Sequence, residues 1–125
     1  MGYIELNVLN NVDQPMALGI DLGTTNSLAA TWKDGRPVVL KPEGGHGGSI
    51  PSVVHFAEGG GATIGRKALN KATIDPRGTI FSIKRFMGRG LADVQEELKS
   101  FPFPVSEDER GLLQVDVYGN PMTPQ

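Results

Sequence analysis

The stretch GIDLGTTNS, residues 19–27, decides how the rest of this chain is interpreted. The apolar run that leads into it, residues 16–20, predicts a buried strand, and the apolar run at residues 28–32 predicts a second strand leaving a turn. A glycine at the tip of such a hairpin, Gly23, lets backbone N–H groups approach an anion because no Cβ stands in the way. The alternative is an ordinary turn whose polar side chains only satisfy neighbouring backbone groups.

The side chains around this turn suit a phosphate group and its metal ion. The hydroxyls of Thr24, Thr25 and Ser27 add hydrogen-bond donors to those of the backbone. Asp21, at the end of the first predicted strand, can hold a hydrated magnesium ion beside the phosphates. Taken alone, the stretch is thus as typical of a phosphate-binding hairpin as of an ordinary turn.

Composition excludes several classes of function. The 125 residues have a formal net charge of −2, and the 12 Lys and Arg are scattered, so we expect no nucleic-acid partner and no membrane surface. There is no cysteine, which excludes disulfides and thiolate metal sites in this sequence. His46 and His55 lack metal-ligand spacing, and we expect both to be structural. Residues 1–16 have no signal-peptide pattern and are expected to form a polar extension with a candidate strand at Tyr3–Val8.

The N-terminal half reads mainly as strands. Asp34-Gly35 is a strong two-residue turn signal, so residues 16–40 predict an antiparallel meander of three strands. The glycine-rich segment at residues 44–48 predicts a loop, and Ile50–Phe56 predicts a single strand with a proline near its start. Residues 62–64 predict one more short strand.

The second half adds helices. Residues 66–73 predict a helix of about two turns that ends before Asp75-Pro76. Thr79 is expected to cap a second helix with an apolar face, and residues 91–98 predict a third. Alternation over residues 113–117 predicts a half-buried strand in a hairpin, followed by a turn at Gly119-Asn120.

Three segments together resemble the 70-kilodalton heat-shock chaperone family: residues 19–27, the strand IPSVVHF at residues 50–56, and IKRFMGR at residues 83–89. The first motif alone is shared with sugar kinases and other actin-like ATPases, whereas the third is far more specific. Asn26 resembles the bacterial and organellar branch, and the run GLADVQ, residues 90–95, is similar to the branch that serves iron–sulfur assembly.

The resemblance implies a role for each matching residue. Asp21 is the carboxylate that holds magnesium through water. Lys84 is the catalytic lysine, which places a positive charge against the transferring phosphoryl group. Thr24 contacts the terminal phosphate and the magnesium shell. The implied cofactor-binding residues are Gly23, Thr24, Thr25, Asn26 and Lys84.

The resemblance also implies a fold and an activity. The fold is α/β, of the actin-like ATPase (ribonuclease-H-like) type and present in part. Residues 17–125 are the N-terminal portion of the nucleotide-binding domain, comprising the first β-meander of lobe I and most of the small upper subdomain. The parent protein is implied to be a cytoplasmic ATP hydrolase that binds ATP or ADP with magnesium, extended client peptides and co-chaperones.

Departures from the family pattern limit what this chain can do alone. Residues 48–50 read Gly-Ser-Ile where the family has a basic residue and a threonine, and the family's second phosphate loop, catalytic glutamate and adenosine motif have no counterpart in this sequence. We therefore expect no turnover from this chain by itself. Two alternatives remain: a sugar kinase, which is not expected to carry Lys84–Arg89, and a non-catalytic interaction module that retains the phosphate hairpin.

Overall fold

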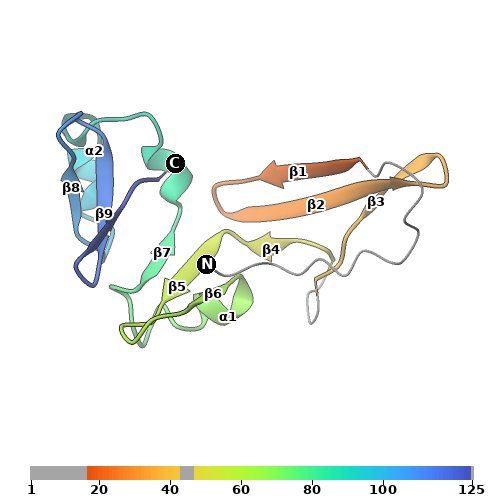
Figure 1. The fold of residues 1–125 in the computed structure, drawn as a ribbon, viewed down its shortest axis with the longest axis horizontal. Helices are drawn as coiled ribbons and strands as arrows, with labels where there is room; N and C mark the ends of the chain where they lie inside the picture. Colours follow the sequence, from red (N-terminus) through yellow and green to blue (C-terminus); the bar gives the residue numbers. More distant parts are fainter. Residues whose placement is uncertain (1–16, 43–46, 125) are drawn as a thin grey trace.

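The chain is α/β, with three small antiparallel sheets, two short α-helices and one 3₁₀ turn among the described residues (Figure 1). The computed structural model describes residues 17–42 and 47–124. The candidate strand at Tyr3–Val8, most of the predicted glycine loop, and His46 lie outside these ranges. No helix in the described ranges is long and apolar enough to cross a membrane.

The first sheet is the predicted meander, which forms the right-hand arm of Figure 1. It contains β1 (Leu18–Leu22), β2 (Asn26–Lys33) and β3 (Arg36–Val39), and β4 (Ile50–Pro51) pairs with the start of β2. Asp34 and Gly35 both have positive φ, 52° and 75°, as a two-residue hairpin turn matched to strand twist requires. The three-strand prediction is confirmed.

The prediction that the first strand is buried was wrong. Every residue of β1 is exposed, and Leu18, Ile20 and Leu22, which share one face of the strand, are 46%, 69% and 56% exposed. The physical reason is that β1 packs extensively only against β2, its neighbour in the sheet, so no other described element covers its faces. Within the described part of the chain, these side chains join no buried core cluster.

The second sheet contains β5 (Val53–Phe56), β6 (Ala62–Ile64) and β7 (Thr79–Phe81), with β5 in the middle. The single strand predicted over Ile50–Phe56 is divided at Ser52, so that β4 and β5 belong to different sheets. The division follows from the hydrogen bonds of Ser52, whose backbone N–H donates to Thr25 O at 2.8 Å, outside either ladder.

Two helix predictions in this region were wrong in extent or kind. Helix α1 (Arg66–Leu69) is shorter than predicted, because the residues that follow it form tighter turns with bonds such as Lys71 N–H to Ala68 O. Thr79 begins strand β7 instead of capping a helix: it is fully buried, and its hydroxyl donates to Asp75 O at 2.7 Å. The helical spacing that follows produces only the 3₁₀ turn η1 (Ile83–Phe86).

The helix at residues 91–98 and the middle strand of the third sheet, at residues 113–117, lie where the sequence predicts them. Helix α2 (Leu91–Leu98) lies where it was predicted, and β9 (Leu113–Val117) buries alternate residues between β8 (Val105–Glu107) and β10 (Asn120–Met122). The turn before β10 is formed by residues 118 and 119, one position earlier than predicted, because both have positive φ (52° and 80°).

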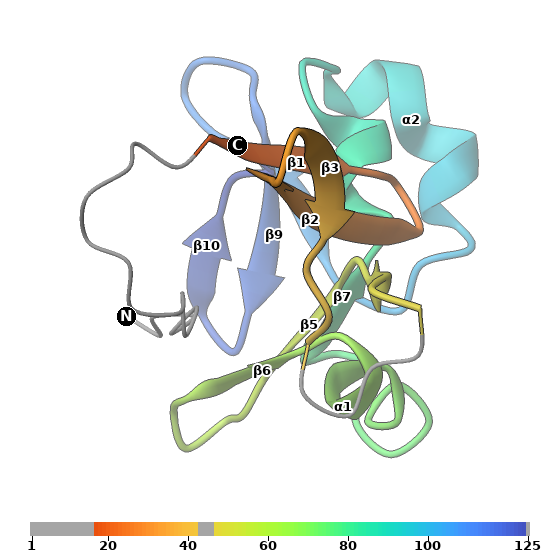
Figure 2. The same cartoon turned by 90° about the vertical axis from the view of Figure 1, so that its right-hand side faces the viewer.

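The hydrophobic core lies in the part of the molecule that contains the third sheet, beneath α2 and between β7 and β9 (Figure 2). Phe86, Val94 and Leu113 are at most 2% exposed. Four phenylalanine rings pack with centroids 4.9–5.8 Å apart, in tilted and edge-to-face arrangements that aromatic pairs prefer. The buried members of this cluster thus all come from β7 onwards, Phe56 of β5 packs against them, and the meander contributes no residue.

His55 is structural, as predicted. It is 7% exposed, and its Nε2 lies 2.8 Å from Oδ2 of Asp75. The other oxygen of that carboxylate accepts a hydrogen bond from the hydroxyl of Tyr118 at 2.6 Å. One carboxylate therefore connects β5, the loop before β7 and the turn after β9.

Candidate functional site

The tip of the β1–β2 hairpin is the centre of the candidate site. The last paired residues are Leu22 and Ser27, so the tip consists of Gly23–Asn26. A Cβ added to Gly23 would lie 2.2 Å from the carbonyl oxygen of Asn26, well inside the distance at which carbon and oxygen can pack. The fold therefore requires glycine here, because the backbone of the tip turns back on itself at close range.

Ser52 holds this tip in place from the junction of β4 and β5. Its hydroxyl donates to Gly23 O at 2.7 Å and lies 2.7 Å from the hydroxyl of Ser27. Its backbone N–H donates to Thr25 O at 2.8 Å. Ser52 is thus a positioning residue for the hairpin. The sequence placed it in a strand motif, but only the fold shows which turn it reaches.

Lys84, the predicted catalytic lysine, also reaches the hairpin. It comes from η1, 62 residues away in sequence from Leu22, and its Nζ donates to Leu22 O at 2.7 Å. The side chain is exposed, so the ammonium keeps contact with solvent. The ammonium of Lys84 therefore places a positive charge beside the backbone of Leu22, the residue before Gly23.

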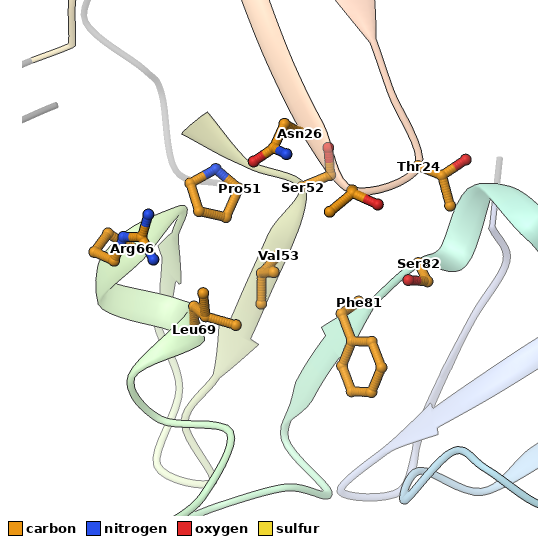
Figure 3. Close-up of a pocket in the computed structure, with 10 residues that line it drawn as sticks. Thr24, Asn26, Pro51, Ser52, Val53, Arg66, Leu69, Phe81 and Ser82 are labelled. Atoms are coloured by element: carbon orange, nitrogen blue, oxygen red, sulfur yellow. The ribbon is translucent and has the colours of Figure 1, made fainter. Parts of the chain in front are cut away.

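A cavity of about 190 Å³ opens between the hairpin tip, α1 and β7 (Figure 3). Its lining combines a polar set with an apolar set. The polar residues are Thr24, Thr25, Asn26, Ser52, Arg66 and Ser82. The apolar residues are Pro51, Val53, Leu69 and Phe81.

Three of the predicted phosphate-binding residues, Thr24, Thr25 and Asn26, therefore face one cavity, and Gly23 shapes the turn that presents them. Asp21 and Lys84 are not in the cavity lining. Asp21 lies on β1, opposite Leu28 of β2, and its carboxylate is exposed.

No cluster of three or more His, Asp or Glu side chains in residues 17–42 and 47–124 is arranged to hold a metal ion. Sequence reasoning missed Arg66 and Ser82 as cavity residues. They lie next to the hairpin only through the packing of α1 and β7 beside it, and no local pattern signals that packing.

Comparisons with known proteins agree with the resemblance. The sequence model for the family described as "Hsp70 protein" matches residues 17–125. The chain is 47% identical over 110 residues to the chaperone protein DnaK of Thermus thermophilus, covering 87% of this chain and 17% of that one. It is 45% identical over 109 residues to a chaperone protein HscA homolog of Janthinobacterium, covering 87% and 17%.

A third relative, an HscA homolog of Burkholderia ambifaria, is 48% identical over 100 residues, covering 80% of this chain and 16% of that one. The chain thus spans about a sixth of the length of the relatives it matches. The match includes the hairpin, the Ser52 junction and the Lys84 segment. On this basis, the chain belongs to the Hsp70 family.

Proposed function

We propose that this chain forms one wall of the nucleotide site of an ATP-dependent chaperone, with Gly23–Asn26 as the hairpin that binds the phosphates of ATP or ADP. One observation carries the proposal: three residues of the tip line a single cavity, and Ser52 fixes the turn that presents them. Family membership supports it, since the relatives are named as chaperones.

The size of the cavity supports a partial site. Pockets that enclose a small-molecule ligand have volumes of about 300–1,000 Å³, and this cavity has about 190 Å³. It suits the phosphate end of a nucleotide, with the adenosine contacts supplied by residues outside this sequence. We accordingly assign residues 17–125 to the first meander and small upper subdomain of an actin-like lobe, preceded by an extension at residues 1–16.

We propose that Asp21 is the residue that holds the magnesium ion. A hard cation such as magnesium keeps several water ligands and is bound through one or two carboxylates together with substrate phosphates. An exposed carboxylate on β1, two residues before Gly23, suits contact through water. Asp21→Asn should then weaken the magnesium dependence of nucleotide binding, and an unchanged dependence would contradict this assignment.

Lys84 enters the proposal as the catalytic lysine. Its ammonium already lies against the hairpin, through Leu22 O, and a cation near a transferring phosphoryl group stabilises the charge that develops there. A second explanation is that Lys84 only positions the turn. The variant Lys84→Gln distinguishes the two explanations, because it keeps a donor for Leu22 O but removes the charge.

We base the proposed cellular role on membership of the Hsp70 family. The parent protein would bind extended apolar client peptides, be regulated by co-chaperones, and work in the cytoplasm of a bacterial-type cell. ATP hydrolysis would change its affinity for clients. No nucleic acid or membrane takes part.

The test is a chimera in which residues 17–125 replace the matched segment of the T. thermophilus relative. We expect magnesium-dependent ATP hydrolysis by the chimera. Lys84→Ala and Lys84→Gln should both lower kcat by about 100-fold or more with a smaller change in nucleotide affinity. Arg85→Ala, which removes the neighbouring exposed cation, is the matched control and should leave kcat unchanged.

A chimera that folds but binds no ATP would refute the proposed function. If Lys84→Gln retained the kcat of the parent chimera while Lys84→Ala lost it, the lysine would be a positioning residue and its catalytic assignment would fall. The hairpin assignment would survive that second result.

A further inference from the structure

The cavity beside the hairpin contains one charged residue. Of its ten lining residues, Arg66 alone carries a charge. Its guanidinium makes no hydrogen bond or ion pair with another described residue. The exposed side chain therefore places a group with five donors at the edge of a hydroxyl-rich hollow, with none of those donors bound to another described residue.

Helix α1 presents Arg66 to the cavity selectively. Arg66 and Leu69 are three residues apart, so they share a helix face, and both line the cavity. Lys67 and Lys71, on the same segment, do not line it. In Figure 3, Arg66 lies at one end of the cavity and Thr24 at the other, with Pro51 and Ser52 between them.

The chemistry of this lining favours an oxyanion. A guanidinium matches the geometry of phosphate oxygens and can donate two parallel hydrogen bonds, which are roughly twice as strong as neutral ones. The hydroxyls of Thr24, Thr25 and Ser82 add neutral donors, and no carboxylate lines the cavity to repel an anion. A second hollow, of about 210 Å³, is lined by both Arg77 and Asp116, so its charges offset one another.

We infer that Arg66 is the cation that binds the terminal phosphate from the cavity side, opposite the hairpin tip. This rests on the proposed function, because the phosphate must lie against Thr24 and Thr25 for Arg66 to reach it across the cavity. Lys84 then contributes charge from the β1 side of the hairpin and Arg66 from the α1 side.

The experiment is a titration of the ¹⁵N-labelled chain with inorganic pyrophosphate, and separately with Mg·ATP, at constant ionic strength. Amide shifts at Gly23–Asn26 and the side-chain Nε–Hε signal of Arg66 are followed by NMR. The method detects millimolar affinities, which suits a site with one wall.

We expect both sets of signals to shift with the same dissociation constant. Arg66→Gln should weaken binding by at least about tenfold, because it removes a charge-assisted hydrogen bond to the phosphate. Arg66→Lys should recover part of the affinity. Lys67→Gln, which removes the neighbouring charge outside the cavity, should change it by no more than about twofold.

Equal effects of Arg66→Gln and Lys67→Gln would overturn the inference and leave the hairpin assignment intact. Hairpin shifts without any shift of the Arg66 Nε–Hε signal in the unmodified chain would also overturn it, and this measurement does not depend on any variant folding. The absence of hairpin shifts with either ligand would remove the proposed function and the inference together.

Discussion

Removing the hydroxyl of Ser52 should loosen the phosphate hairpin by a predictable amount. Ser52→Ala deletes two hydrogen bonds of 2.7 Å, one to Gly23 O and one to the Ser27 hydroxyl, both partly buried. A typical net contribution is about 0.5–1.5 kcal/mol per bond, so we expect the free energy of unfolding to fall by about 1–3 kcal/mol. For a chain of 125 residues, each kcal/mol lowers Tm by about 4 °C.

The assay is urea unfolding combined with amide hydrogen exchange. Exchange at residues 23–28 should accelerate by at least about fivefold if the loss is local, since about 1 kcal/mol is about a factor of five in the opening equilibrium. Ser27→Ala, which removes only the bond between the two hydroxyls, should lose about half as much. Ser100→Ala is the control, because Ser100 is exposed and its hydroxyl has no partner among the described residues. The reasoning fails if Ser52→Ala and Ser100→Ala have the same free energy of unfolding and the same exchange rates at residues 23–28.

Further predictions concern the core and the charge network. Phe86→Ala should cost about 3–5 kcal/mol by urea unfolding, because the ring is 1% exposed and packs edge-to-face on Phe101 at 4.9 Å; a loss below about 1 kcal/mol would contradict the packing described. Hydrogen bonds from Tyr118 and then His55 lower the pKa of Asp75 below 3.8. Its contribution to stability is therefore present above pH 3.8 and lost as pH falls below it. When Tm is measured as a function of pH, it should fall at acid pH in the parent chain by more than in Asp75→Asn. The same fall in both proteins would refute the network. The hydrogen bond to Asp75 raises the pKa of Tyr118 from 10.0 to about 12. Stability from this group is full below pH 10 and lost as pH rises from 10 to 12, and a Tyr118→Phe variant with the same alkaline profile would disprove it.

Local patterns were enough to predict the elements whose structure depends on near neighbours. Strong turn residues and alternation specified the meander and β9, and helical spacing specified α2. The site hairpin was found for the same reason: Gly23 and the hydroxyls beside it are contiguous in sequence.

Elements that depend on distant partners were not predictable in this way. The apolar spacing after Thr79 fits a helix, but pairing with β5, where Thr79 lies opposite His55, stabilises a strand instead. Residues 50–56 read as one strand, because no local signal shows that Ser52 directs its N–H and hydroxyl to the hairpin. Arg66 was missed for the same reason, since its place at the cavity depends on how α1 packs near the tip.

The attachment of Lys84 to Leu22 has a consequence for the order in which the molecule folds. A hairpin between adjacent strands forms in about 1–10 μs, so β1 and β2 can pair before the rest of the chain is organised. Anchoring the tip to Ser52 closes a separation of 29 residues from Gly23, and anchoring it to Lys84 closes one of 62 residues from Leu22. The longer closure costs about 0.7 kcal/mol more in chain entropy, and it needs η1 to be in place on the core. The hairpin thus forms early, whereas its attachment to the core is a late folding event. Mutations in the core should therefore slow assembly of the phosphate cavity without slowing formation of the hairpin.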